Sequence, residues 1–129
     1  MKKPLSDNEQ RKYLLAKIKE PVHFTYPEPP HHLEGILKDR FVLKEGEDEY
    51  VTYWDIVDLI EFKKEDEEWL RMTYYRYKKK ENRWVFAGQT SLTNPISKFE
   101  ELFVKAIKEK QWMKTFFKHV FKKCSADLN

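Results

Sequence analysis

Residues 50–62, YVTYWDIVDLIEF, decide the fold, because they are compatible with either a strand or a helix. Trp54, Val57 and Ile60 recur at the spacing of one helical face. Most of the other side chains are β-branched or aromatic, and these residue types favour strands. We therefore predict a strand that extends to residue 63, although a helical turn within it stays open.

Three further runs of similar composition flank this stretch, and short charged segments separate all four. The separators are short enough for hairpins, so consecutive strands should pair antiparallel. The sequence therefore predicts a four-stranded antiparallel β-meander within residues 33–92, with strands over 33–43, 50–63, 68–79 and 83–92.

The N-terminal segment combines a helix signal with a helix-breaking one. Ser6 and Glu9 have the spacing of a capping box, in which each side chain accepts from the other residue's backbone N–H. We predict a helix over residues 7–19. Residues 20–32 follow, with four prolines within ten residues, and should form an extended arm that lies on the domain.

After Asn94 and Pro95, the spacing of apolar residues changes from about every second residue, as in a strand, to about every 3.6 residues, as in a helix. Asn94 suits a helix cap and Pro95 the first helical position, so residues 95–123 should be helical. This segment forms either one long helix or two short ones that divide near Gln111. The predicted class is α+β, with the C-terminal helices packed on one sheet face.

Length and composition point to a single domain over residues 1–129 in a reducing compartment. Cys124 is the one cysteine, which excludes an internal disulfide, and no apolar run approaches the roughly 20 residues of a membrane span. We expect a cytoplasmic location. Charged residues make up 36% of the chain, as in many heat-adapted proteins.

Charge is distributed unevenly along the chain. Residues 1–68 carry a net charge of −6 and residues 69–129 carry +9, which together give the overall +3. Such asymmetry is typical of proteins with an electrostatic partner. The alternative is that acidic turns and basic strands neutralise each other after folding.

Residues 71–92, RMTYYRYKKKENRWVFAGQTSL, carry the candidate site. Aromatic rings and cations on one exposed face hold single-stranded nucleic acid by stacking and phosphate contacts. The candidate binding residues are Arg71, Tyr74, Arg76, Lys78, Arg83, Trp84 and Phe86.

The strands predicted at 68–79 and 83–92 form a hairpin, and the number of residues in its turn decides which rings share a face with which cations. A three-residue loop would pair residues 79 and 83, and place Tyr74, Arg76 and Lys78 beside Trp84 and Phe86. A two-residue loop would instead gather the rings into a hydrophobic face made of Trp69, Tyr75, Tyr77, Trp84 and Phe86.

A basic amphipathic pattern marks the C-terminal segment. Lys114, Lys118 and Lys122 recur at helical spacing, opposite phenylalanine and valine positions. Such a helix can cover its own core, bind an acidic protein or a membrane surface, or build a homodimer interface. The sequence leaves the partner and the oligomeric state open.

Asp39, followed by Glu61 and Lys63 at the end of an apolar run, resembles the Asp and Glu-x-Lys arrangement of PD-(D/E)xK nucleases. In that family the two carboxylates hold Mg²⁺, and the lysine positions the attacking water. The resemblance covers about 25 residues, and the proline that precedes the aspartate in that family is missing. After the third predicted strand, this sequence predicts another strand where that family has a helix. We therefore predict a non-enzymatic binding module without catalytic residues, metal or cofactor.

Overall fold

The computed structural model describes residues 3–24, 33–62, 66–87 and 92–128. The chain forms two compact units, Met1–Leu92 and Thr93–Asn129. The first unit holds one helix and a β-sheet, and the second holds two helices. This is the predicted α+β class, while the organisation as one domain stays a prediction.

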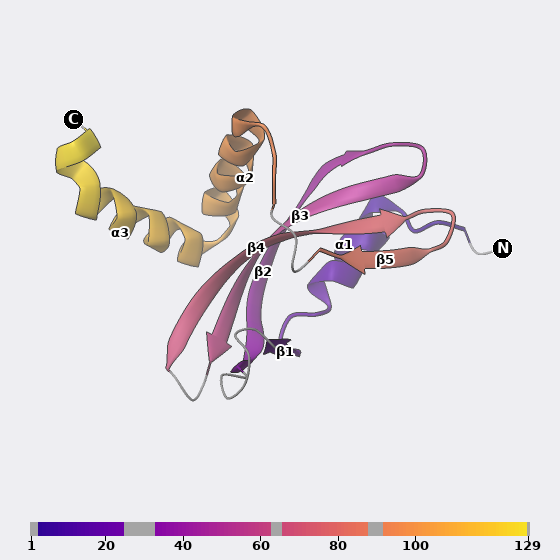
Figure 1. Ribbon diagram of the computed structural model, residues 1–129, viewed down its shortest axis with the longest axis horizontal. Coiled ribbons are helices and arrows are strands. Elements are labelled where there is room, and N and C mark those ends of the chain that lie inside the picture. Colours follow the sequence, from indigo (N-terminus) through magenta and orange to yellow (C-terminus); the bar gives the residue numbers. More distant parts are fainter. Residues whose placement is uncertain (1–2, 25–32, 63–65, 88–91, 129) are drawn as a thin grey trace. The chain divides into compact units, whose positions relative to one another are not determined.

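A five-stranded antiparallel sheet forms the first unit (Figure 1). Its strands lie side by side in chain order, so each one pairs with the next along the sequence. They are β1 (Pro21–Phe24), β2 (Leu33–Glu47), β3 (Val51–Phe62), β4 (Glu67–Lys78) and β5 (Arg83–Phe86). The four-stranded meander predicted for residues 33–92 is therefore present as β2 to β5. Strand β1, which precedes it, is one strand more than expected.

The central strand β3 contains the stretch that decides the fold. It pairs with β4 without interruption from Val51↔Lys78 to Phe62↔Glu67, and no helical turn occurs in it. Seven consecutive residues from Trp54 to Ile60 are buried, so the side chains of this central strand are covered on both faces of the sheet. Its content of β-branched and aromatic side chains thus outweighs the helical spacing of its apolar residues.

The fifth strand lies within the predicted proline-rich arm. Residues 21–24 pair with β2, from Pro21↔Ile36 to Phe24↔Leu33. Pro21 is tolerated because it is the first residue of an edge strand, where its missing N–H breaks no ladder. The rest of the arm, residues 25–32, lies outside the described residues.

Helix α1 (Asp7–Leu15) begins with the predicted capping box. The Glu9 backbone N–H donates to Ser6 Oγ at 3.2 Å, and the Ser6 N–H donates to Glu9 Oε1 at 2.9 Å. The helix ends before the predicted residue 19. Lys19 has a φ of 78°, and its N–H donates to the Leu37 carbonyl at 2.6 Å, so the chain already joins the sheet there.

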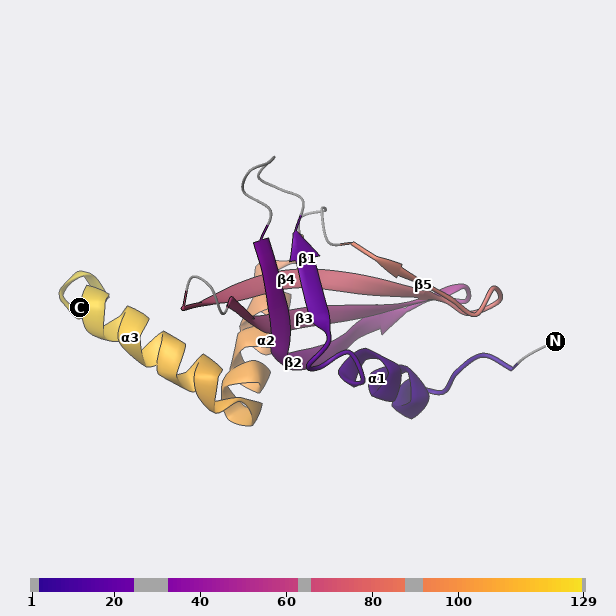
Figure 2. The same cartoon turned by 90° about the horizontal axis from the view of Figure 1, so that it is seen from below.

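One face of the sheet, named the α1 face, packs against α1 (Figure 2). Leu14 is fully buried in a cluster with Val42, Trp54 and Ile56. The indole N–H of Trp54 donates to Gln10 Oε1 at 2.8 Å, so a buried polar group is satisfied across the contact. The α1 face therefore carries this part of the core, while Phe41, Val57 and Leu59 are buried on the opposite face.

The second unit consists of α2 (Ile96–Glu109) and α3 (Gln111–Leu128), joined by the extended residue Lys110. Their boundary confirms the division near Gln111. Pro95, and not Asn94, is the N-cap residue of α2, and this cap has no side-chain hydrogen bond, because proline has no polar side-chain atom. None of the described helices is long and apolar enough to cross a membrane. Packing of α2 and α3 on a sheet face stays a prediction.

Candidate nucleic-acid interface

The β4–β5 hairpin has an even-numbered loop. Lys78 pairs with Arg83, which leaves residues 79–82 as a four-residue turn. Asn82 adopts a φ of 47°, a left-handed conformation that asparagine tolerates. The Tyr77 hydroxyl donates to Asn82 Oδ1 at 2.6 Å and fixes the turn. The loop has neither of the two predicted lengths, but its four residues give the same facing of side chains as the two-residue alternative.

This register divides the seven candidate residues between the two faces of the sheet. Arg71, Trp84 and Phe86 lie on the α1 face, because they share the pleat of Tyr75 and Tyr77. The other four candidates point to the opposite side, where Tyr53 of β3 joins them. We name this second surface the basic face, and it consists of Tyr53, Tyr74, Arg76, Lys78 and Arg83.

Trp84 is part of the packing between the hairpin and α1. Its ring stacks on Tyr13 at a centroid distance of 4.6 Å and an interplanar angle of 4°. The Tyr77 ring lies 4.9 Å away on the same face. A flat ring stacked so closely on another has one π-face covered, which leaves Trp84 half-buried.

Arg71 on the α1 face belongs to a buried ionic cluster. Asp58 is completely buried and lies between Arg71 and Arg40, with N–O distances of 2.8 Å and 2.7 Å. Arg40 also donates to the Leu14 carbonyl at 3.0 Å. Burial alone would lower the pKa of Arg40, but its hydrogen bonds to Asp58 hold the pKa above its usual value. The cluster joins three strands to the end of α1.

The basic face combines rings and cations in two neighbouring rows. Tyr53, Arg76 and Val85 form one row across β3, β4 and β5, and Lys78 and Arg83 form the next. Tyr53, Tyr74, Arg76 and Lys78 are each partly exposed, and Arg83 is exposed. Paired positions on one face bring side chains to roughly 5 Å from each other.

The cations of the basic face differ in their local partners. Arg83 Nε lies 3.0 Å from Glu81 Oε2, and both side chains are exposed. Arg76 Nε is buried and has no hydrogen-bond partner among the described residues. Asp55, a carboxylate on the same face, is buried. The cations near the turn therefore lie beside Glu81 and, across the pairing of β3 with β4, beside the exposed acidic residues of the β2–β3 turn.

The carboxylate of Glu47, at the end of β2, is bound by two lysines. Glu47 accepts from Lys44 at 2.7 Å and from Lys79 at 2.6 Å. These hydrogen bonds lower the pKa of Glu47 to about 2. Lys44 also pairs with Asp7 at 2.8 Å, so this exposed network ties α1 to the β2–β3 end of the sheet.

Asp39 and Glu61, the two described residues that resemble a nuclease site, do not form the metal-binding arrangement of that family. Asp39 Oδ1 accepts from the Arg40 backbone N–H at 2.9 Å, and Glu61 lies 3.4 Å from the ammonium of Lys38. Lys63 lies outside the described residues. Within the described ranges, no group of three His, Cys, Asp or Glu side chains could hold a metal ion.

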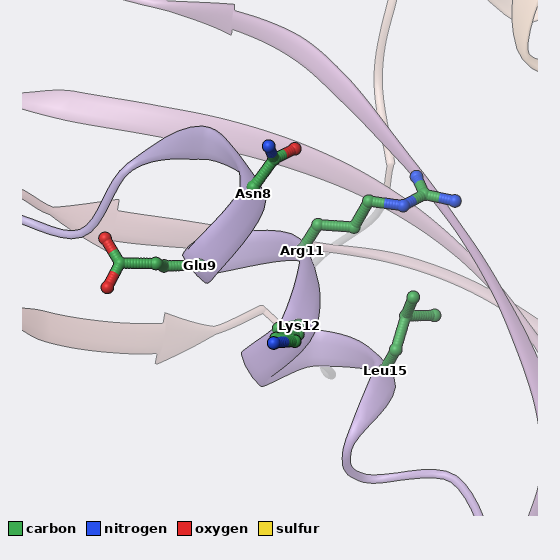
Figure 3. A pocket seen from close by; sticks show the side chains of 5 residues that line it. All are labelled: Asn8, Glu9, Arg11, Lys12 and Leu15. Atoms are coloured by element: carbon green, nitrogen blue, oxygen red, sulfur yellow. The ribbon is translucent and has the colours of Figure 1, made fainter.

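An open hollow of about 430 Å³ lies along α1, lined by Asn8, Glu9, Arg11, Lys12 and Leu15. Figure 3 shows the Glu9 carboxylate and the Arg11 guanidinium pointing away from each other. Arg11 reaches the Val42 carbonyl at 3.4 Å, and Glu9 belongs to the capping box. These polar groups do not converge on a common point, so the hollow does not form a defined binding site.

Tyr53 is the one residue of the basic face that the sequence did not single out as a candidate. Its place there depends on the pairing of β3 with β4, which brings it opposite Arg76. The alternation of side chains around Tyr53 and Asp55 of β3 would have placed Tyr53 on this face if the pairing register had been known.

No family model, no curated protein and no solved structure matches this chain.

Proposed function

We propose that the protein is a binding module that holds single-stranded nucleic acid on the basic face. The observation that supports this proposal is the Lys78↔Arg83 register, which places Arg76, Lys78 and Arg83 on the same side of the sheet as Tyr53 and Tyr74. Cations that follow a backbone beside rings that stack bases are typical of surfaces that bind single strands.

The proposed division of labour follows from side-chain chemistry. Arg76, Lys78 and Arg83 contact phosphates, since guanidinium and ammonium groups donate hydrogen bonds to anionic oxygens. Tyr53 and Tyr74 stack on bases, and stacking tolerates any sequence because every base has a π-face. Binding is therefore expected to be strongly salt-dependent and only weakly sequence-dependent.

Arg71, Trp84 and Phe86 take a supporting role in this proposal. They lie on the α1 face, where Trp84 stacks on Tyr13 and Arg71 contacts Asp58. A strand bound flat on one face of the sheet does not reach the other face. The proposed contact surface therefore keeps four of the seven residues chosen from the sequence and adds Tyr53.

Fluorescence titration with a labelled single-stranded oligonucleotide tests the proposal. Lys78→Ala should weaken binding and lower the log–log salt slope by about 0.7, the value for one lost phosphate contact. Lys12→Ala is the matched control, because it removes the same charge from α1 on the other side of the sheet. An equal effect of the two substitutions would indicate attraction by net charge alone.

The aromatic contribution is tested separately. Tyr74→Leu should reduce the binding free energy by about 1–3 kcal/mol and leave the salt slope nearly unchanged. Tyr50→Leu, in the turn before β3, removes an exposed tyrosine outside the basic face and should have little effect. A folded wild-type protein with no binding at about 100 μM in low salt would contradict the proposal.

A further inference from the structure

An apolar stripe follows one side of α3. Phe117, Val120 and Phe121 recur at the spacing of one helical face, with Phe116 beside them. Their accessibility is high for such side chains, at 43% for Phe116, 37% for Val120 and 55% for Phe121. Large apolar groups gathered on one helix face indicate an interaction surface.

The phenylalanines of the second unit pack on one another and leave Phe116, Val120 and Phe121 of the stripe exposed. Phe117 lies 5.3 Å from Phe103 of α2, and 6.2 Å from Phe121, between ring centroids. The three exposed side chains are therefore available to an apolar partner surface.

Lysines border the stripe, and the first acidic residue of α3 is Asp127. Lys114, Lys118 and Lys122 follow one edge at i, i+4 and i+8, and Lys123 lies on the other side. Residues 110–126 contain five lysines and no Asp or Glu. The surface that covers the stripe should therefore be apolar at its centre and negatively charged around it.

We infer that α3 lies on an anionic membrane surface, with Phe116, Val120 and Phe121 in the boundary of the acyl chains. The lysine stems extend from the stripe toward the headgroups, which is how amphipathic helices bind at an interface. A second copy of the chain fits less well, because antiparallel pairing of two α3 helices would place their lysine-rich edges against each other.

Vesicle flotation of the full chain tests this inference. The protein should float with phosphatidylcholine vesicles that contain phosphatidylserine, and bind pure phosphatidylcholine vesicles much more weakly. Phe121→Ser should weaken binding at least about tenfold through the lost apolar contact. Lys118→Ala should weaken it about fivefold, the effect of one charge near an anionic surface.

Matched variants separate this inference from the nucleic-acid proposal. Lys78→Ala and Lys12→Ala should leave vesicle binding unchanged, and Phe121→Ser should leave oligonucleotide binding unchanged. Equal binding to both kinds of vesicle, or no binding to either, would overturn the inference. A dimer in light scattering that Phe121→Ser dissociates, or a large loss of thermal stability in that variant, would also overturn it, because the stripe would then be covered by protein.

Discussion

Arg40 and Asp58 face each other on adjacent strands and form an ion pair from which solvent is excluded. Arg40 Nε lies 2.7 Å from Asp58 Oδ1 and Arg40 NH2 lies 3.1 Å from Oδ2, so the contact is bidentate. The Arg40 guanidinium also lies 5.3 Å from the centre of the Tyr75 ring. This pair, together with Arg71, determines how β2, β3 and β4 meet beneath α1.

Asp58→Asn should destabilise the protein by about 3–5 kcal/mol, because it leaves the buried Arg40 without its counter-ion. Urea unfolding followed by tryptophan fluorescence measures the change. Glu101→Gln is the control, since it removes an exposed carboxylate that pairs with Lys105, and it should alter stability very little. A similar small effect of Asp58→Asn would show that the cluster contributes little to folding.

Trp84 should behave as a scaffold residue. A double-mutant cycle between Tyr13→Ala and Trp84→Ala should give a coupling energy of about 0.5–1.5 kcal/mol, as expected for stacked rings. Oligonucleotide affinity per folded molecule should change little in either variant. Additive effects on stability, or a loss of binding in Trp84→Ala alone, would instead place this ring in a ligand contact.

Gly35 should be intolerant of any side chain. A Cβ at this position would lie 2.8 Å from Ile60 Cγ2 and 2.9 Å from Phe62 Cε1, so Gly35→Ala should cost about 1–3 kcal/mol of stability. Gly46 lies in the same strand, and a Cβ there would meet nothing within 4 Å. Gly46→Ala should therefore be neutral in the same thermal unfolding assay, and equal melting temperatures for the two variants would contradict this packing.

Glu47 should titrate well below an ordinary glutamate. Its pKa is lowered from 4.5 to about 2, so it stabilises the fold above pH 4.5, and this contribution is lost as pH falls through about 2. Carbon-detected NMR of its carboxyl group measures the pKa directly. Lys79→Ala should raise this pKa only part of the way, because Lys44 remains bound. An ordinary pKa in the wild type would show that the lysine contacts do not persist in solution.

Local signals in the sequence predicted the parts of the fold that depend on neighbouring residues. The capping box of Ser6 and Glu9 and the strand character of residues 51–62 are properties of short segments. Where the chain meets distant residues, local signals were insufficient. The extension of α1 to residue 19 was wrong because the Lys19 backbone pairs with Leu37, and the strand at Pro21 was missed because it forms only by pairing with β2.

The candidate site was predictable in composition and not in geometry. Both a three-residue loop and the observed four-residue loop place Asn82 in a turn, yet they move Trp84 and Phe86 to opposite faces. The buried Arg40 and Asp58 had a signal in the sequence, since each interrupts an apolar run at a position that should face the core. Their pairing depended on the β2 bulge between Leu37 and Asp39, which the sequence did not predict.

The most direct test of the nucleic-acid proposal is a two-dimensional NMR titration of the labelled protein with a single-stranded oligonucleotide. The account predicts that the largest shifts occur at Tyr53, Tyr74, Arg76, Lys78 and Arg83, and that these shifts diminish together as salt is added. Signals of Tyr13 and Leu14 should move little, because α1 covers the opposite face. Shifts centred on α1 or α3, with the basic face unchanged, would contradict the proposed function.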